Sequence, residues 1–265
     1  MTPVLVFDIE TIPDTDGLRK LLGLPPETSA AEVAQIAFHQ RRQNGLSEFL
    51  PLHVQKVIAI SCVLREGENN FRVWSLGAPD EGEGTLIQRF YDGIEKYKPT
   101  LLSWTGGGFD LPVLHYRGLM HNVVAATYWD MGDDDRDFKW NNYISRYHMR
   151  HTDLMDLLAL YQGRGNAPLD QLAQLCGFPG KLGMDGSRVW EAYQAGEIEA
   201  IRSYCETDVV NTWLVYLRFQ HMRGLLTAAA YQRELTLVRE SLAANPAKHW
   251  QEFLAAWSDS QTAKL

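Results

Sequence analysis

The sequence predicts an α/β fold in which a mixed sheet is flanked by helices. Short runs of β-branched and other apolar residues alternate with longer segments whose apolar residues recur every three or four positions. A link of Gly, Glu, Asn and Asn at 67–70 joins two of the apolar runs and favours their antiparallel pairing. The 45% hydrophobic and 22% charged residues among 265 provide an ample core for such a fold.

Four segments have the composition of buried strands. The first covers residues 4–9 and runs into acidic residues. Because side chains alternate between the two faces of a strand, Asp8 and Glu10 should lie on the same face. The other strand candidates are Val57–Leu64, Phe71–Leu76 and Leu101–Trp104.

Helix candidates lie between and after these strands. In the insertion that follows the first strand, Ser29 and Glu32 have the spacing of a capping box. Arg41 and Arg42 close that helix, where capping and solvation are favoured over contact with a substrate phosphate. The other candidates are Thr85–Tyr97, a helix that begins near Asp110, Leu169–Leu175, Glu197–Arg218 and the tail beyond Gly224.

Four carboxylates and one tyrosine, spread along the chain, fit a two-metal nuclease site. They are Asp8, Glu10, Asp110, Tyr204 and Asp208. Acids placed together raise one another's pKa and would in part protonate unless cations accompany them. The set contains only hard oxygen ligands, which favours Mg²⁺ or Mn²⁺ over zinc. Two such ions about 3.5 to 4 Å apart stabilise the attacking and leaving oxygens of a phosphodiester displacement.

Local geometry supports the grouping, although each residue alone has a simpler interpretation. A spacing of four places Tyr204 and Asp208 on one helix face, where such residues are ordinarily rim residues. Asp110 follows three glycines and precedes Leu-Pro, which suits the first turn of a helix, and aspartate there is usually a cap. Acids at a strand end are more often turn residues. The combination, in the order strand, helix start and late helix, favours the metal site.

The three motifs resemble those of a known superfamily. FDIET, GFDLPVL and the YxxxD of Tyr204 and Asp208 are similar to the exonuclease motifs of the DEDD 3′-to-5′ exonucleases, and the tyrosine marks the DEDDy branch. The chain is most similar to stand-alone bacterial proteins related to the proofreading exonuclease domain of family-B DNA polymerases. The likeness implies a ribonuclease-H-like mixed five-stranded sheet. We expect an exonuclease domain over 1–220 and a C-terminal helical extension, 221–265, packed on the same domain.

The resemblance also implies a role for each motif residue. Asp8, Glu10 and Asp208 would hold the metal that activates water, and Asp8 with Asp110 would hold or orient a second metal near the leaving 3′ oxygen. Tyr204 would position the water, since a phenol with an ordinary pKa near 10 is a poor base at neutral pH.

Other residues beside the motifs are candidate substrate contacts. They are Thr11, Thr105 and Phe109, with Phe109 able to stack on a base or to pack in the core. Thr105 departs from the asparagine common in this branch. Lys181, the cation nearest in sequence to the catalytic helix, is a candidate phosphate contact.

Several other polar residues have weaker claims on function. Cys205 points about 100° away from Tyr204 on a helix and is expected to pack in the core. Asp153 and Asp156 are expected to start a helix, with support of the site as the second interpretation. His148 and His151 lack a third zinc ligand and are expected to be surface or core residues.

The net charge limits the nucleic-acid partners that the chain can bind, and the cysteine content bears on its cellular compartment. A net charge of −8 argues against a broad basic surface, so we expect weak binding to long duplexes and preference for a single-stranded or frayed 3′ end of DNA. RNA is the enzymatic alternative, and a catalytically weak nucleic-acid-binding or partner-docking module the non-enzymatic one. Three cysteines without a CxxC motif suit a cytoplasmic protein, and no apolar stretch is long enough for a membrane. Proofreading would need a polymerase or repair partner.

Overall fold

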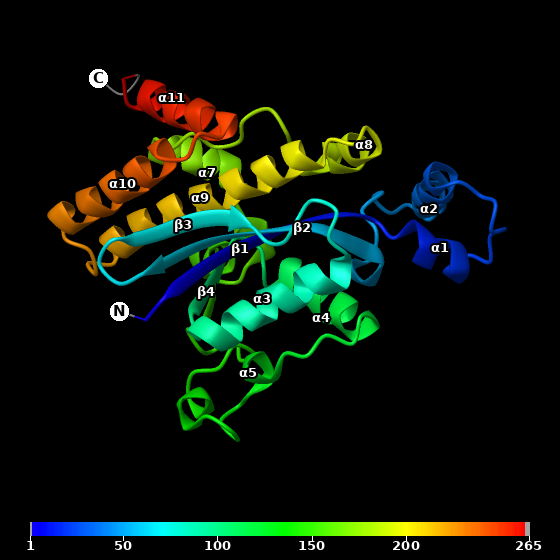
Figure 1. Ribbon diagram of the computed structural model, residues 1–265, viewed down its shortest axis with the longest axis horizontal. Coiled ribbons are helices and arrows are strands. Elements are labelled where there is room, and N and C mark those ends of the chain that lie inside the picture. Colours follow the sequence, from blue (N-terminus) through cyan, green and yellow to red (C-terminus); the bar gives the residue numbers. More distant parts are fainter. Residues whose placement is uncertain (1, 263–265) are drawn as a thin grey trace.

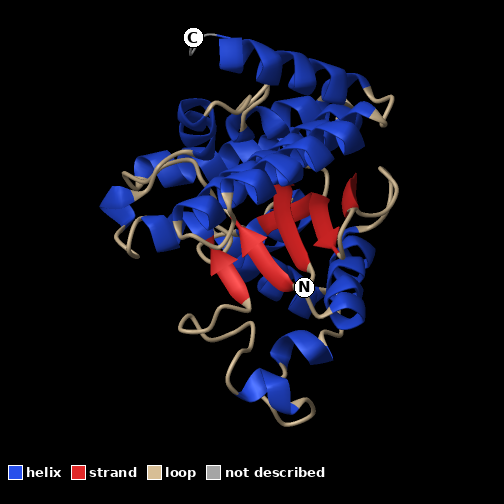
Figure 2. Ribbon diagram, turned by 90° about the vertical axis from the view of Figure 1, so that its left-hand side faces the viewer, coloured by secondary structure: helices blue, strands red, loops and turns tan. Residues whose placement is uncertain are grey.

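The computed structural model describes residues 2–262, with side chains described for 2–258, and confirms the α/β expectation (Figure 1). Five strands form one mixed sheet in the order β3-β2-β1-β4-β5 (Figure 2). β1 pairs antiparallel with β2 and parallel with β4, so it lies at the centre. The strands are β1 (Val4–Pro13), β2 (Gln55–Glu66), β3 (Asn70–Ser75), β4 (Thr100–Ser103) and β5 (His151–Asp153).

Four of the strands agree with the sequence prediction, and their ends differ for identifiable reasons. β1 continues beyond Ile9 because a register shift between Glu10 and Thr11 lets the pairing with β2 run on to Gln55. The β2–β3 pair is antiparallel, as the 67–70 link predicts. β5 was not among the strand candidates, since its three residues, His-Thr-Asp, are too few and too polar to form a recognisable pattern.

Helices cover both faces of the sheet and extend beyond it. The predicted capping box of Ser29 and Glu32 is present at the start of α2, and Gly177 ends α7 in the left-handed conformation that glycine favours. The helices are α1 (Thr15–Leu21), α2 (Ala30–Gln43), α3 (Glu83–Tyr97), α4 (Asp110–Met120), α5 (Ala126–Trp129), α6 (Leu154–Leu158), α7 (Leu169–Cys176), α8 (Val189–Gln194), α9 (Ile198–Met222), α10 (Ala228–Ala243) and α11 (Lys248–Thr262).

The alternation of side chains along β1 separates two cores. Leu5, Phe7 and Ile9 face α3 and α4. Val6 faces the opposite layer, where it packs with residues of α7, α9 and α10. Asp8 continues on this second face, toward α9, at the point where the apolar core gives way to a cleft. The strand therefore places its acids beside the long helix.

The C-terminal helices enlarge the second core. Tyr231 and Leu235 of α10 and Trp250 and Phe253 of α11 are buried in the same cluster as Trp213 of α9. In Figure 1, α10 and α11 lie beside α9 at the upper part of the molecule. α10 also reaches the sheet, where Glu234 pairs with Arg65 of β2 at 2.7 Å. The C-terminal helices thus pack on the same face of the sheet as α9.

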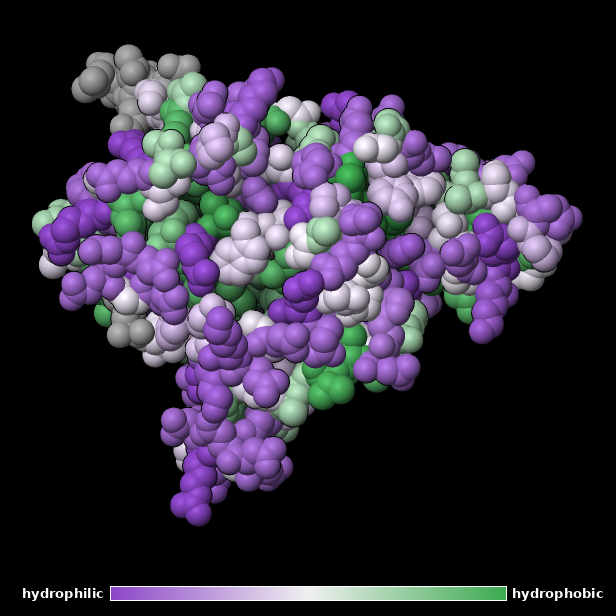
Figure 3. Space-filling model, in the orientation of Figure 1, coloured by the Kyte–Doolittle hydropathy of each residue, from purple (hydrophilic) through white to green (hydrophobic). Residues whose placement is uncertain are grey.

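Helices α1 and α2 form an arm that projects from the body, at the right of Figures 1 and 3. The arm has a small core of its own, with Leu18, Val33, Ala37, Leu50 and Val54. The visible face in Figure 3 is mainly hydrophilic, with hydrophobic groups in separate patches. Within residues 2–262, no helix combines the length and apolar content that a membrane crossing would require.

Candidate active site

Asp8 and Glu10 lie on β1 where it passes α9. Glu10 is buried and Asp8 is half-buried. One ligand atom from each of these two carboxylates and the thiol of Cys205 all lie within 4.8 Å of one another. The spacing of two along a strand thus produces the shared face that the sequence predicted.

Asp110 is brought to the same place by a turn between β4 and α4. It is the first residue of α4, as its position before Leu-Pro predicted. Its Oδ1 atom accepts a hydrogen bond of 3.1 Å from the backbone N–H of Ile9, between the two acids of β1. This bond joins segments that are 101 residues apart in the chain.

Tyr204 and Asp208 lie one turn apart on α9, and both side chains are buried. Lys181 Nζ donates a hydrogen bond of 2.5 Å to the Tyr204 hydroxyl and lies 3.7 Å from Asp208 Oδ2. The other carboxylate oxygen of Asp208, Oδ1, is buried and has no hydrogen-bond partner among the described residues. A buried carboxylate oxygen without a donor is the atom that a cation would satisfy.

The electrostatics of these residues are dominated by burial. Desolvation raises the pKa of Asp110 to about 7 and that of Asp208 to about 6, although Lys181 opposes the shift at Asp208. The pKa values of Asp8 and Glu10 also rise well above their usual range, first through desolvation and then through the negative charge of neighbouring acids. Ionising the whole group without cations is therefore costly.

Cys205 is buried as predicted, but it also contacts the acidic group. Its Sγ lies 3.4 Å from the carbonyl oxygen of Asp8 and 3.5 Å from Asp8 Oδ2. Burial and the neighbouring Asp8 raise the pKa of the thiol, so it remains protonated and can donate. The spacing argument from Tyr204 gave no sign of this contact.

The turn that carries Asp110 is fixed by Asp153. Asp153 Oδ1 accepts a hydrogen bond from the backbone N–H of Thr105, and Oδ2 accepts one from Gly107. The same carboxylate caps α6, which confirms the predicted helix-start role and adds support of the turn. Thr105 has φ +71°, a left-handed conformation that is unfavourable for a β-branched residue. At Gly106, a Cβ would lie 2.3 Å from Ser103 Oγ, so only glycine fits there.

The motif residues open onto one cleft of about 830 Å³. One wall is polar and includes Asp8, Glu10, Asp110, Lys181 and Asp208. Another part of the lining is a largely apolar wall that consists of Phe49, Leu52, Trp104, Phe109, Met155 and Leu169. A polynucleotide end has the same division, with charged phosphate on one side and flat bases on the other.

The remaining candidates lie at different distances from this cleft. Thr105 and Phe109 line it, whereas the Thr11 hydroxyl donates to Gln55 Oε1 at 3.0 Å, beside it. His151 Nε2 is 2.9 Å from Ser103 Oγ in the interior, and His148 Nδ1 accepts a hydrogen bond of 3.0 Å from the backbone N–H of Asn142. The two histidines therefore have the structural environments predicted for them.

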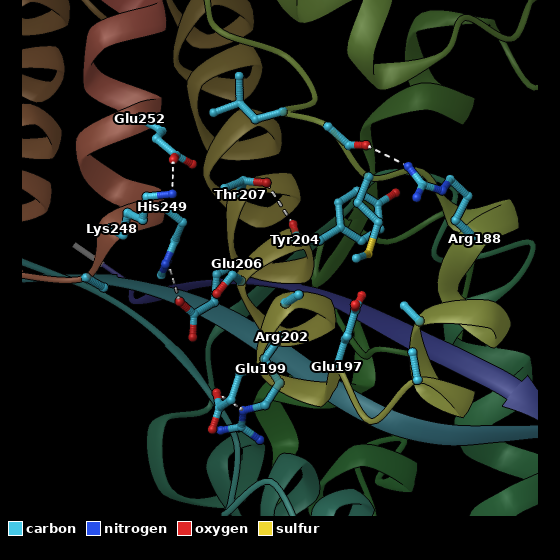
Figure 4. A pocket seen from close by; sticks show the side chains of 18 of the residues that line it. Arg188, Glu197, Glu199, Arg202, Tyr204, Glu206, Thr207, Lys248, His249 and Glu252 are labelled. Atoms are coloured by element: carbon cyan, nitrogen blue, oxygen red, sulfur yellow. Dashed lines mark hydrogen bonds and ion pairs between the residues drawn. The ribbon is translucent and has the colours of Figure 1, made fainter.

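A second cleft, of about 890 Å³, lies between α8, α9 and α11 (Figure 4). Tyr204 lines both clefts. Charged residues of the second cleft pair with one another, including Glu206 with His249 at 3.0 Å and Lys248 with Glu252 at 2.9 Å. Its charges are thus largely neutralised within the protein, in contrast to the acidic cleft.

The acidic cleft fits divalent cations. Its candidate ligands are carboxylate oxygens, the type that Mg²⁺ and Mn²⁺ prefer, and Asp208 Oδ1 has no donor among the described residues. The single lysine is too little positive charge for four acids. These residues could therefore hold a divalent cation without rearrangement of the fold.

Comparison with solved structures agrees with this architecture. The family B DNA polymerase from the hyperthermophilic archaeon Pyrobaculum calidifontis matches 83% of this chain with a TM-score of 0.50 at 14% sequence identity. The match covers 24% of the polymerase chain, so this protein spans about a quarter of that enzyme's length. At this identity the likeness shows the fold alone. No curated protein matches the chain.

A family model identifies the chain more directly. Residues 47–257 match the family described as "predicted 3′-5′ exonuclease related to the exonuclease domain of PolB". The matched range contains Asp110, Lys181, Tyr204 and Asp208, and the first motif precedes it. The match covers more than half of the sequence. This chain therefore belongs to the family of 3′-5′ exonucleases related to the exonuclease domain of PolB.

Proposed function

We propose that this exonuclease is metal-dependent and releases nucleotides from the 3′ end of DNA that is single-stranded or frayed, with the DEDDy residues and two Mg²⁺ or Mn²⁺ ions. The observation that carries the proposal is the convergence of four acids and Tyr204 from three distant segments on one cleft. A group of buried acids with raised pKa values is costly to maintain for structure alone. A binding module without catalysis would have no use for it.

The residues divide into ligands and positioning groups. Asp8, Glu10 and Asp208 would hold one cation, and Asp8 with Asp110 would hold the second. Cations bound there would lower the pKa of a water molecule and neutralise charge on the phosphodiester. The hydrogen bond from Ile9 keeps Asp110 in register with the acids of β1.

Tyr204 is suited to orienting a water molecule rather than deprotonating it. Desolvation and the charges of neighbouring acids raise its pKa above the ordinary value near 10, so the phenol is protonated at neutral pH. Lys181 donates to the same hydroxyl and fixes its position. The phenol can then donate its own proton to an oxygen in the cleft.

Net charge bears on the substrate, and the cysteines bear on the cellular compartment. With a net charge of −8, the chain has little to hold a long duplex, so the cleft must obtain its affinity from a strand end. Three unpaired cysteines are consistent with a reducing cytoplasm. Proofreading in that setting would need a polymerase or repair protein as a partner.

The test is an assay with single-stranded DNA and RNA labelled at either end, with Mg²⁺, Mn²⁺ or a chelator. We expect mononucleotides from the 3′ end only when metal is present, with DNA preferred. Asp8→Ala should lower the rate by about 10³-fold or more, because it removes a ligand common to both cations. Equal degradation by the wild type and this variant would reject the proposal.

A further inference from the structure

An exposed aromatic side chain from the arm lies at the apolar wall of the acidic cleft. Phe49 precedes η1 (Leu52–Val54), in the segment that returns from α2 to the body. Its side chain is 57% exposed although it lines the cleft. The ring centroid is 5.5 Å from that of Phe109, with the planes inclined at 54°. Phe109 in turn directly precedes Asp110.

The arm holds the backbone of Phe49 in place from the N-terminal side. Arg41 Nε donates to the carbonyl oxygen of Ser47 at 2.7 Å, and Arg42 pairs with Glu48. The sequence predicted capping and solvation for the two arginines, and the structure instead pairs them with the segment that follows α2. These contacts occupy both guanidinium groups within the arm, so the arginines fix the residues that lead to Phe49.

A second set of contacts holds Phe49 from the C-terminal side. Leu50 is buried in the core of the arm, and its carbonyl oxygen accepts a hydrogen bond of 3.1 Å from Gln55 Nε2. Gln55 Oε1 accepts in turn from the hydroxyl of Thr11, which follows Glu10 on β1. The segment is therefore tied to the catalytic strand, and its exposed ring has a fixed position relative to the acids.

The two rings offer what a terminal nucleobase needs. A base that leaves its stack loses apolar contact on both faces, and an aromatic side chain can replace one of them without regard to base identity. The Phe49 and Phe109 rings are mutually inclined, so they form a corner instead of a closed stack. The corner lines the same cleft as Lys181 and Asp208.

We propose that Phe49 and Phe109 form an aromatic corner that receives the unpaired 3′-terminal base while its phosphodiester lies at the carboxylates. This inference rests on the proposed function and specifies its substrate. A base within an intact duplex is covered by its neighbours and cannot enter, so the corner selects frayed or single-stranded ends. Phe49 belongs to the arm, which makes the arm a determinant of substrate choice.

The test compares two single-stranded oligonucleotides that differ only at the last nucleotide, which carries a base in one and is abasic in the other. The KM ratio, abasic over intact, should be about 5 to 100 for the wild type. In Phe49→Ala we expect the ratio to fall by about threefold or more, while Phe49→Trp should restore it. Leu46→Ala is the matched control, since Leu46 is 53% exposed in the same segment and does not line the cleft.

The outcomes separate this proposal from the assignment of activity. Equal ratios in wild type and Phe49→Ala, or an equal fall in Leu46→Ala, would overturn the aromatic corner while leaving the exonuclease intact. A wild type that releases no nucleotides would overturn the proposed function instead. In that case the two oligonucleotides are compared by their Kd values, measured by fluorescence anisotropy with chelator present. A Kd ratio, abasic over intact, that falls in Phe49→Ala would support the corner, and an unchanged ratio would overturn it.

Discussion

Two regions of this protein are rich in aspartate, and they use it in opposite ways. The loop of residues 130–137 has five aspartates, of which Asp133, Asp134 and Asp137 are exposed. Four of the acids that line the cleft, Asp8, Glu10, Asp110 and Asp208, are the motif residues and are buried or half-buried. Burial with like charges raises the pKa of each of these four carboxyls, whereas hydrogen bonds lower the pKa values of Asp130 and Asp135. The surroundings of a carboxylate, rather than its abundance, decide whether it can serve as a metal ligand.

The hydrogen-bond donors account for the difference. Asp130 accepts from the backbone N–H groups of residues 132, 133, 134 and 135, which lower its pKa although partial desolvation opposes them. Asp135 pairs with Lys98 Nζ at 2.6 Å. In the cleft, Asp208 Oδ1 has no donor among the described residues. The loop satisfies its acids internally, and the cleft leaves capacity for cations.

The largest expected difference between the two regions is catalytic. Asp110→Asn keeps the Oδ1 acceptor for Ile9 but removes the charge, and it should lower the rate of 3′-end release by about 10³-fold. Asp134→Asn, an equivalent change on the exposed loop, should leave the rate within about twofold of the wild-type rate. Both rates are measured on the same labelled oligonucleotide. Comparable losses in the two variants would contradict the distinction drawn here.

The second difference concerns metal and pH. Because folding raises the pKa of Asp110 to about 7 and of Asp208 to about 6 from the ordinary 3.8, the metal-free fold becomes less stable as pH rises from about 4 to about 7. Mg²⁺ should relieve that cost, by about 2.7 kcal/mol at a concentration 100 times its Kd. The gain in melting temperature from Mg²⁺ should therefore be large at pH 8 and small near pH 5, where protons compete.

The matched variants give the control for this measurement. Asp110→Asn should lose most of the Mg²⁺-dependent gain at pH 8, and Asp134→Asn should keep it. A gain that is equal at both pH values, or that survives in Asp110→Asn, would place the bound cation elsewhere.

The third difference is the sign of a stability change. Asp130→Ala removes the acceptor of four backbone N–H groups and should lower the melting temperature by about 2 to 4 °C with little effect on activity. Asp208→Asn removes a desolvated charge and should raise the metal-free melting temperature while abolishing activity. Thermal unfolding in chelator measures both, and shifts of the same sign would show that hydrogen-bond donors do not distinguish the two regions.

The smallest expected effect comes from the turns that carry the acids. Thr105 has φ +71° in the turn before Asp110, a conformation that asparagine adopts more readily. Thr105→Asn should therefore stabilise the protein by about 1 kcal/mol in denaturant unfolding. Thr127→Asn in α5, where φ is not positive, should have no such effect. Destabilisation by Thr105→Asn would indicate that the 3.5 Å contact of Thr105 Oγ1 with Met155 outweighs the strain.

Local sequence pattern was enough to predict several parts of the site. An apolar run predicted β1, and its period of two placed Asp8 and Glu10 on one face. A spacing of four predicted that Tyr204 and Asp208 share a face of α9, and the glycines with Leu-Pro predicted the start of α4 at Asp110. Each of these rests on neighbours within a few residues.

Only the tertiary structure decided which distant residues meet. It joined Ile9 to Asp110, turned Cys205 toward Asp8, set Asp153 under the turn before α4 and placed Phe49 against Phe109. It also paired β5, whose three residues have no strand pattern of their own. Such contacts depend on how whole elements pack, and packing is settled by the summed burial of two cores that no local window contains.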